Sequence, residues 1–436
     1  MRLLTSKCIE FSLEPRWRAG LFLSLAALAT LLGSTESIRV AAATAIAKSV
    51  QAPELRKALG WDPDNAALHS RLAQTEGGSI EASEVAEAIR HARRATELAP
   101  EKSDYWMTLA SACEAGGNKD CAGQALERSL ALSPMTPQVW WVAANHDLSS
   151  GRADAALACF HRLLDLSPDY AEPAFSLALR AYGDPNLILD RVVSGSRDSR
   201  LALAFADFLS ARDQFDAAHR AWEQAAGGNM GFPFADVQPY LERLLSHCRY
   251  SEAQGVWRNL EARGVIAQPA GSTADNLVFN GGFEQLPLEA GFDWRSQPSE
   301  IASVDFADAA SYEGARCLRI DFPVGRNDEF EPVSEMLPLA SDKTYRIAAY
   351  VRSREITSDS GPRLRVVDAD CPRCLDVATD AAVGTTGWHR VSVRFTTGSQ
   401  TRAVRISVWR PRSRVFPMEI SGSFWLDSVS LRAEPQ

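Results

Sequence analysis

The sequence contains little that would indicate an enzyme. No segment matches G-x-S-x-G, H-E-x-x-H or the glycine-rich loop that holds phosphates, and no pair of carboxylates has a context that would give it two catalytic roles. The histidines share no metal-ligand spacing. We therefore expect a protein without catalytic activity. A glycan-active enzyme with an unrecognised site is an alternative.

Cysteine is also scarce, and the chain has fewer positive than negative charges. Eight cysteines among 436 residues are too few for a scaffold built on disulfides. Cys113 and Cys121 flank one turn and could pair. A loop-closing disulfide is expected between Cys371 and Cys374, with a redox or zinc site as the alternative. The net charge of −9 argues against a general nucleic-acid binder.

Long hydrophobic runs are limited to one segment near the N-terminus. Residues 19–33 are apolar and uncharged, and Arg16 and Arg18 precede them. This order is typical of export signals. A run of 15 residues is short for a membrane span, which favours a cleaved signal peptide. The long N-terminal stub, and the lack of a small-residue cleavage site close after Gly33, favour an uncleaved anchor.

We therefore expect residues 1–50 to form a cytoplasmic stub, a membrane segment and a stalk. The expected location is the bacterial inner membrane, with a single span and the bulk of the chain in the periplasm. Secretion after cleavage is the alternative.

The stretch from Trp106 to Pro168 repeats at an interval of 34 residues. Trp106, Gly117 and Pro134 recur as Trp140, Gly151 and Pro168. Within each unit, apolar residues follow helical spacing on both sides of the Gly, so each unit is predicted to be two helices. A fixed period of this length indicates stacked helical repeats.

These residues resemble the tetratricopeptide repeat (TPR) pattern. The match consists of a tryptophan, small and apolar residues on the first helix, an A-x3-L or A-x3-F pair on the second, and a final proline: Trp106, Leu109, Ala110, Ala122, Leu126, Pro134, and Trp140, Ala143, Ala144, Ala156, Phe160, Pro168. Cys113 and Asp147 occupy the position where tyrosine is usual. The resemblance implies an α-solenoid, about six units over residues 51–264, with a concave groove for a protein partner.

The tryptophans at repeat-matched positions are expected to fill the seams between helices, and this applies to Trp106, Trp140, Trp222 and Trp257. Trp141 is different, because a residue one position along a helix points about 100° away. We predict that Trp141 contacts a protein partner in the groove.

The composition changes after Gly264. Residues 265–275 are expected to form a polar linker, and residues 276–436 then alternate apolar and polar side chains with a period of two. About nine short strands are predicted, which indicates an antiparallel β-sandwich. The fold class is therefore a multidomain α + β chain: a membrane segment, a TPR-like solenoid and a sandwich.

The ends of this region resemble the galactose-binding-like jelly roll, and especially carbohydrate-binding modules. The matching motifs are residues 276–284 (NLVFNGGFE), 312–320, 387–391 and 424–431 (FWLDSVSL). The resemblance implies a jelly-roll fold and a sugar ligand. It also implies a structural calcium ion, with Glu284 and Asp427 as the matching carboxylates.

Aromatic side chains on a polar strand face, or in a loop beside it, are candidates for stacking on sugar rings, and Trp409, Tyr350 and Trp294 meet this description. Thirteen arginines lie between Arg346 and Arg414, against seven carboxylates between Asp342 and Arg414. Arg346 and Arg352 share a strand face with Tyr350, and Arg405 shares one with Trp409. Guanidinium groups bind carboxylates bidentately, so an acidic polysaccharide is the expected ligand. Solvation of exposed strands is the alternative role of these arginines.

Together these features predict a non-catalytic envelope scaffold that combines protein binding with carbohydrate binding, in polysaccharide assembly, export or attachment. A protein-assembly scaffold whose sandwich binds no sugar is the alternative.

Overall fold

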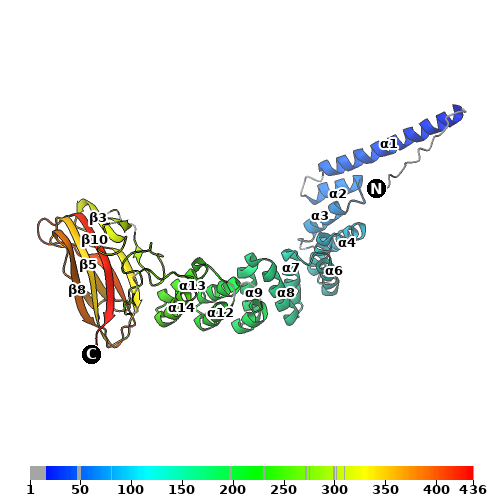
Figure 1. The fold of residues 1–436 in the computed structure, drawn as a ribbon. Coiled ribbons are helices and arrows are strands. Elements are labelled where there is room, and N and C mark those ends of the chain that lie inside the picture. Colours follow the sequence, from blue (N-terminus) through cyan, green and yellow to red (C-terminus); the bar gives the residue numbers. More distant parts are fainter. Residues whose placement is uncertain are drawn as a thin grey trace, which may run out of the picture. The chain divides into compact units, whose positions relative to one another are not determined.

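The computed structural model describes residues 16–46, 51–79, 81–195, 199–228, 231–270, 273, 275–297, 300, 302–308 and 310–435. The chain divides into two compact units, Met1–Val192 and Val193–Gln436. Along the chain the helices come first and the strands last (Figure 1). The first unit is helical. The second contains further helices and a β-sandwich. The predicted fold class is confirmed.

Helix α1, Arg16–Ile46, carries the apolar segment. Its stretch Gly20–Arg39 is 20 residues long and apolar enough to cross a membrane, as signal sequences near an N-terminus also are. At 1.5 Å per residue this stretch is about 30 Å long, the thickness of a bilayer's hydrocarbon core. This stretch is longer than the 15 uncharged residues expected, because its mean hydropathy stays high although it includes the polar residues 34–37 and Glu36.

Short antiparallel helices continue from α2 through the rest of the first unit. Their bounds are α2 Ala52–Trp61, α3 Ala66–Glu76, α4 Ala82–Leu98, α5 Ser103–Ala115, α6 Lys119–Leu132, α7 Pro137–Ser149, α8 Ala153–Leu166, the 3-10 turn η1 Pro168–Tyr170, α9 Ala171–Tyr182, α10 Pro185–Ile188 and the π-helical turn η2 Leu189–Val193. The regular pairs end at α8, because Asp184 caps a new four-residue helix after Gly183. The boundary between the two units falls in η2.

The pairs pack through small side chains. Buried alanines in α4, α5 and α6 let neighbouring helices approach closely, and Leu109 and Leu126 fill the remaining space. Trp106 and Trp140 lie at equivalent places. Each donates its indole N–H to the carbonyl of the proline six residues earlier, at 2.8 Å. Trp222 and Trp257 are buried. All four tryptophans therefore have structural contacts within the helical region.

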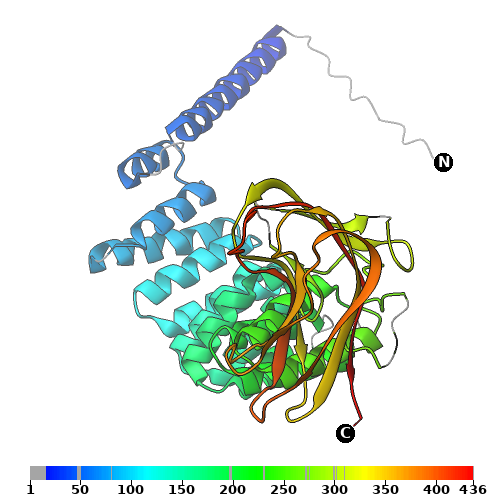
Figure 2. The same cartoon turned by 90° about the vertical axis from the view of Figure 1, so that its left-hand side faces the viewer.

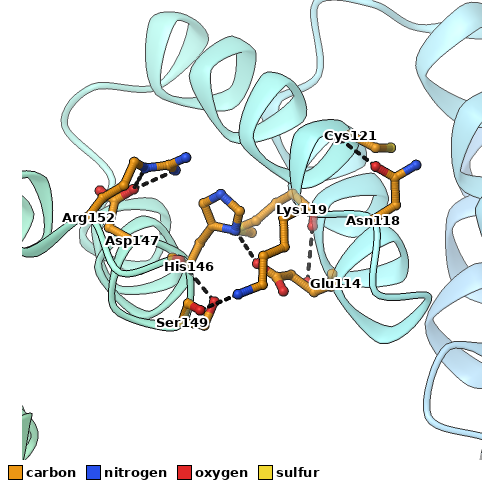
Figure 3. A network of polar contacts seen from close by, with 10 residues as sticks. Glu114, Asn118, Lys119, Cys121, His146, Asp147, Ser149 and Arg152 are labelled. Atoms are coloured by element: carbon orange, nitrogen blue, oxygen red, sulfur yellow. Dashed lines mark hydrogen bonds and ion pairs between the residues drawn. The ribbon is translucent and has the colours of Figure 1, made fainter.

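Cys113 and Asp147 occupy the position where the repeat pattern has tyrosine, and they make different contacts in their two successive units. Cys113 forms a disulfide with Cys121 across the turn between α5 and α6. In the next unit Asp147 accepts two bonds from Arg152 across the turn between α7 and α8, at 2.9 and 2.7 Å (Figure 3). A covalent bond and an ion pair therefore close equivalent turns.

A polar network joins these two units. Buried His146 of α7 points at Glu114 at the end of α5, and Lys119 of α6 donates to the Ser149 carbonyl (Figure 3). Both contacts link one helix pair to the next. They therefore fix how the pairs stack, which apolar contacts alone leave less defined.

The second unit begins with two helix pairs: α11 Ser199–Ser210, α12 Phe215–Gly227, α13 Phe234–Ser246 and α14 Tyr250–Ala262. With α3/α4, α5/α6 and α7/α8 they make five pairs of full-length helices in the described residues, and α9 with the four-residue α10 lies between them. Ten strands follow in the described part of the chain: β1 Arg295–Ser296, β2 Ser303–Asp308, β3 Cys317–Arg326, β4 Phe330–Pro338, β5 Thr344–Ile356, β6 Arg363–Asp368, β7 Asp376–Ala378, β8 Gly384–Thr396, β9 Ala403–Arg410 and β10 Ile420–Ala433.

The strands form two antiparallel sheets, in the orders β1-β4-β9-β6-β7 and β2-β3-β10-β5-β8. Figure 1 labels β3, β10, β5 and β8 of the second sheet, and Figure 2 shows the sandwich from another side. Alternation explains the layers. In β5 the residues Tyr345, Ile347 and Val351 point into a core shared with the other sheet, while Arg346 and Tyr350 point outward. The outer faces of both sheets are thus left for polar and aromatic side chains.

The last helices pack directly on the sandwich. The Trp257 ring of α14 lies 5.0 Å from the Phe279 ring and 5.8 Å from the Phe292 ring. The Tyr250 hydroxyl donates to Asp370 at 2.8 Å. Glu242 of α13 accepts two bonds from Arg295, each at 2.8 Å. Helices α11–α14 and the sandwich therefore belong to one compact unit, although the predicted linker lies between them.

Candidate functional site

The outer face of sheet β2-β3-β10-β5-β8 gathers exposed aromatic rings. The ring of Tyr350 in β5 is stacked on the ring of Tyr312, with centroids 3.6 Å apart and planes within 12°. Trp388 of β8 lies 6.0 Å from Tyr312. Tyr312 is 41% exposed, and Tyr350 and Trp388 are half-buried. We call these three residues the aromatic platform.

Backbone register explains why two of these side chains meet. Tyr350 pairs with Arg390 of β8 on one side and with Asp427 of β10 on the other. Trp388 has the same strand parity as Arg390, so it shares the outer face while Val391 points inward. Arg390 is exposed at the edge of the platform.

Tyr312 comes from the loop between β2 and β3, and two carboxylates hold that loop. Asp427 accepts hydrogen bonds from the backbone N–H groups of Tyr312 at 2.8 Å and Glu313 at 3.0 Å. Glu284 accepts from Ala315 at 2.9 Å. Gly314 adopts φ +71°, and a Cβ atom there would lie 1.9 Å from a Glu284 oxygen, so only glycine fits. The loop that carries Tyr312 is therefore fixed in place.

We call Glu284 and Asp427 the carboxylate clamp, and the burial of Asp427 in it has an electrostatic cost. Asp427 is fully buried, and desolvation raises the pKa of its carboxyl, while the N–H groups of Glu313, Tyr312 and Ser428 oppose the rise. The nearby Glu284 carboxylate raises it further. The N–H bonds thus stabilise the charged form that burial disfavours.

The clamp also bears on calcium. Ca²⁺ takes six to eight oxygen ligands. Here the oxygens of Glu284 and Asp427 accept bonds from backbone N–H groups. Among the described residues, no three His, Cys, Asp or Glu side chains group to hold a metal. Calcium binding stays a prediction.

A cavity of about 710 Å³ adjoins the platform. Its lining includes Tyr350, Arg390, Glu313, Asp427 and Arg432. An aromatic wall with convergent polar groups is the usual composition of a ligand site. Sugars present both apolar C–H faces and hydroxyls, and this lining offers partners for both.

Trp294, expected to face a sugar, is a core residue instead. Its side chain is fully buried, packs against Phe283 at 5.3 Å and donates its indole N–H to the Asn280 carbonyl at 3.1 Å. The loop that carries it folds over the end of the sandwich core, so Trp294 has no face free for a ligand. That prediction is wrong.

Trp409 lies on the outer face of the other sheet and is half-buried. The Arg365 guanidinium sits 4.3 Å from the centre of its ring, and Asp376 holds Arg365 through two bonds. The indole N–H donates to Glu329 at 2.9 Å. A sugar could stack on the covered side only by displacing Arg365.

The three predicted arginines have different surroundings. Arg346 bonds to Glu434 at 2.6 Å, and Arg405 lies 3.6 Å from Glu331 on the other sheet. Arg352 lies beside the platform on β5, with its guanidinium 4.9 Å from the centre of the Trp425 ring. Only Arg346 and Arg352 share a face with Tyr350, and Arg346 already has an anionic partner.

Trp141 in α7 is half-buried. Its ring lies 5.7 Å from Tyr170 and 6.3 Å from Phe160. Part of this side chain therefore packs within its own repeat, and its role in partner binding stays a prediction.

No family model matches the chain, and no curated protein matches it. Solved structures similar to it include a CBM4 module, at 15% identity and TM-score 0.27, covering 36% of this chain and 99% of that chain. TmCBM61 in complex with β-1,4-galactotriose matches at 18% identity and TM-score 0.25, with coverage of 36% and 99%. The MamA protein matches at 16% identity and TM-score 0.28, with coverage of 50% and 96%. These similarities are too weak to assign a family or a function.

Tyr312, Trp388 and Arg390 were not predicted as site residues from the sequence. For Trp388 and Arg390 the signal was present, because the alternation that places Val391 inside places both of them outside. For Tyr312 there was none, because only the folded loop brings it onto the sheet.

Proposed function

We propose that this protein is a non-catalytic envelope scaffold that binds a polysaccharide on the outer face of β5 and β8 and a protein partner along its helical repeats. Helix α1 would hold it in the inner membrane with the bulk of the chain in the periplasm. The process we propose is polysaccharide assembly, export or attachment.

The observation that carries the carbohydrate proposal is the aromatic platform. Three rings from a loop and two strands are gathered at one place on this outer face. Flat apolar rings cost little entropy to fix, and they favour ligands with apolar faces. The adjoining cavity, with Arg390 and Glu313 in its lining, supplies hydrogen-bond partners for hydroxyl groups.

The test is a glycan array with the full chain, followed by titration of the glycans that bind. Trp388→Ala is expected to weaken binding by about fivefold, since an aromatic contact contributes roughly 1 kcal/mol. Trp409→Ala is the matched control, because it removes a half-buried tryptophan from the other outer face. Equal losses in both variants, or no glycan bound by the wild type, would contradict this site.

The protein-binding half of the proposal rests on the helical pairs and on Trp141. Stacked repeats present an extended surface, and a partially exposed aromatic residue is a common anchor for a partner. Trp141→Ala is expected to remove a partner recovered by pull-down with the wild-type protein. Unchanged partners would eliminate Trp141 as a contact. A chain that retains a protein partner but binds no glycan would be a pure assembly scaffold.

A further inference from the structure

We propose that Arg352 and Arg354 form an anion subsite beside the aromatic platform, which takes the carboxylate of an acidic sugar. This inference rests on the proposed function, because it names the chemical class of polysaccharide that the same face would bind. It adds a residue, Arg354, that the sequence did not single out.

The two arginines lie against one indole. Trp425 of β10 pairs with Arg352 of β5 and with Arg319 of β3, so all three side chains share the outer face. The guanidinium carbons of Arg352, Arg354 and Arg319 lie 4.9, 5.6 and 5.4 Å from the centre of the Trp425 ring. Trp425 is only 3% exposed. Stacking on the ring orients the guanidinium groups before any ligand arrives.

Three other arginines of this sheet already have anionic partners. Arg319 bonds to Asp321 at 2.9 Å. Arg346 and Arg394 share Glu434, each at 2.6 Å. These groups therefore have little left for a ligand.

Arg352 and Arg354 differ, since no ion pair to either occurs within the described part of the chain. Arg354 is exposed and Arg352 half-buried. Two like charges two residues apart on a strand face are separated by about 7 Å and repel each other. An anion between them would remove that repulsion and form charge-assisted bonds.

The subsite is aligned with the platform. Tyr350, Arg352 and Arg354 follow one another on the outer face of β5, at successive steps of about 7 Å. A linear polymer lying along β5 would stack one sugar on the platform and bring the charged group of a neighbouring sugar to the arginines. This order favours a polysaccharide with uronic acid residues. Sulfate groups on a polysaccharide carry the same negative charge as carboxylates, so a sulfated polymer is tested separately.

The test compares full-chain variants on polygalacturonate and on the same polymer with its carboxylates methyl-esterified. For the double variant Arg352→Gln/Arg354→Gln we expect a loss of about tenfold or more on polygalacturonate, and no change on the ester. Arg346→Gln is the matched control, because it removes one charge from the same strand face but from a residue paired with Glu434. It should leave binding within about twofold. Thermal melting of each variant controls for folding.

Other outcomes would overturn the subsite. Equal losses on both polymers would mean that the arginines only cover Trp425. An equal loss in Arg346→Gln would mean that general surface charge attracts the polymer. Binding of that kind would disappear at 1 M salt, where the Debye length is about 3 Å. Stronger binding to dextran sulfate than to polygalacturonate would show that the subsite prefers sulfate groups to carboxylates. Binding of the ester alone, lost in Trp388→Ala, would leave the proposed function standing while ending this inference.

Discussion

Individual buried polar residues determine how the sandwich responds to pH. Asp293 precedes Trp294 in the loop over the sandwich core and is 1% exposed. Desolvation raises the pKa of its carboxyl to about 6, although the backbone N–H groups of Leu288 and Trp294 donate to it at 2.8 Å. Glu335 is also buried, and burial raises its pKa well above the usual range.

The raised pKa of Asp293 leads to a prediction with a definite sign. An acid whose pKa is higher in the folded state stabilises the fold below its unfolded pKa, near 4. That contribution is lost as the pH rises through about 6. A shift of this size corresponds to about 3 kcal/mol. In Asp293→Asn, the free energy of unfolding should therefore fall by less than in the wild type between pH 4 and pH 7, as measured by urea denaturation. If the free energy of unfolding changed with pH equally in both proteins, the raised pKa of Asp293 would be contradicted.

At the same scale, the sequence predicted some site residues and not others. Tyr350 and Trp409 lie on outer sheet faces as expected, because strand alternation fixes the side of a residue. Trp294 was assigned wrongly because a loop has no period from which burial can be inferred. The partners of Arg346 and Arg405 were beyond prediction, because Glu434 and Glu331 reach them only through the strand pairing.

At the scale of elements, the loop between β2 and β3 depends on the carboxylate clamp. Asp427→Ala would leave the N–H groups of Tyr312, Glu313 and Ser428 without their acceptor. The expected cost is about 2–4 kcal/mol, since each orphaned donor costs roughly 1–3 kcal/mol and some will find water. Glycan binding should weaken too, because Tyr312 loses its fixed position. A variant with normal stability and binding would show that the clamp is dispensable.

Calcium gives a second prediction for the same two carboxylates. An ion that binds only the folded state raises its stability, so calcium should raise the melting temperature of the wild type over that in chelator. The difference should vanish in Glu284→Gln. Identical midpoints with and without calcium would leave the loop clamp as the role of Glu284 and Asp427.

The disulfide between α5 and α6 stabilises this helix pair. It joins Cys113 to Cys121, eight residues on. Restricting the unfolded chain by a loop of this length contributes about 2–3 kcal/mol. The double variant Cys113→Ala/Cys121→Ala should therefore melt at a lower temperature by helical circular dichroism, and a reductant should bring the wild type down toward it. A wild-type midpoint that does not respond to reductant would refute this contribution.

For the whole molecule, the N-terminal helix decides where the protein resides. If α1 is an uncleaved anchor, the full chain should sediment with membranes and resist carbonate extraction, and a chain starting at residue 51 should be released. The apolar stretch Gly20–Arg39 is the physical reason. A soluble exported form that begins near Thr44 would show instead that the segment is a signal peptide.

Across the whole chain, the sequence predicted the elements better than the boundaries between compact units. The 34-residue period and the strand alternation predicted stacked helix pairs and the sandwich, because each depends on local geometry. The contacts of Trp257 and Tyr250 with the sandwich depend on residues far away in sequence, so no local pattern could show them.

The contact of Trp257 with the sandwich determines where the chain can be divided into separately folding pieces. Gly291 adopts φ +63°, and a Cβ atom there would lie 2.2 Å from the Trp257 ring, so the sandwich loop and helix α14 are shaped to each other at that point. Cloning the sandwich alone as an interchangeable cassette would expose the Trp257 contact surface of Phe279 and Phe292 and would favour aggregation. A transferable module would have to start before α11. Exchange of such sandwiches between proteins by recombination should therefore carry the last two helix pairs along with them.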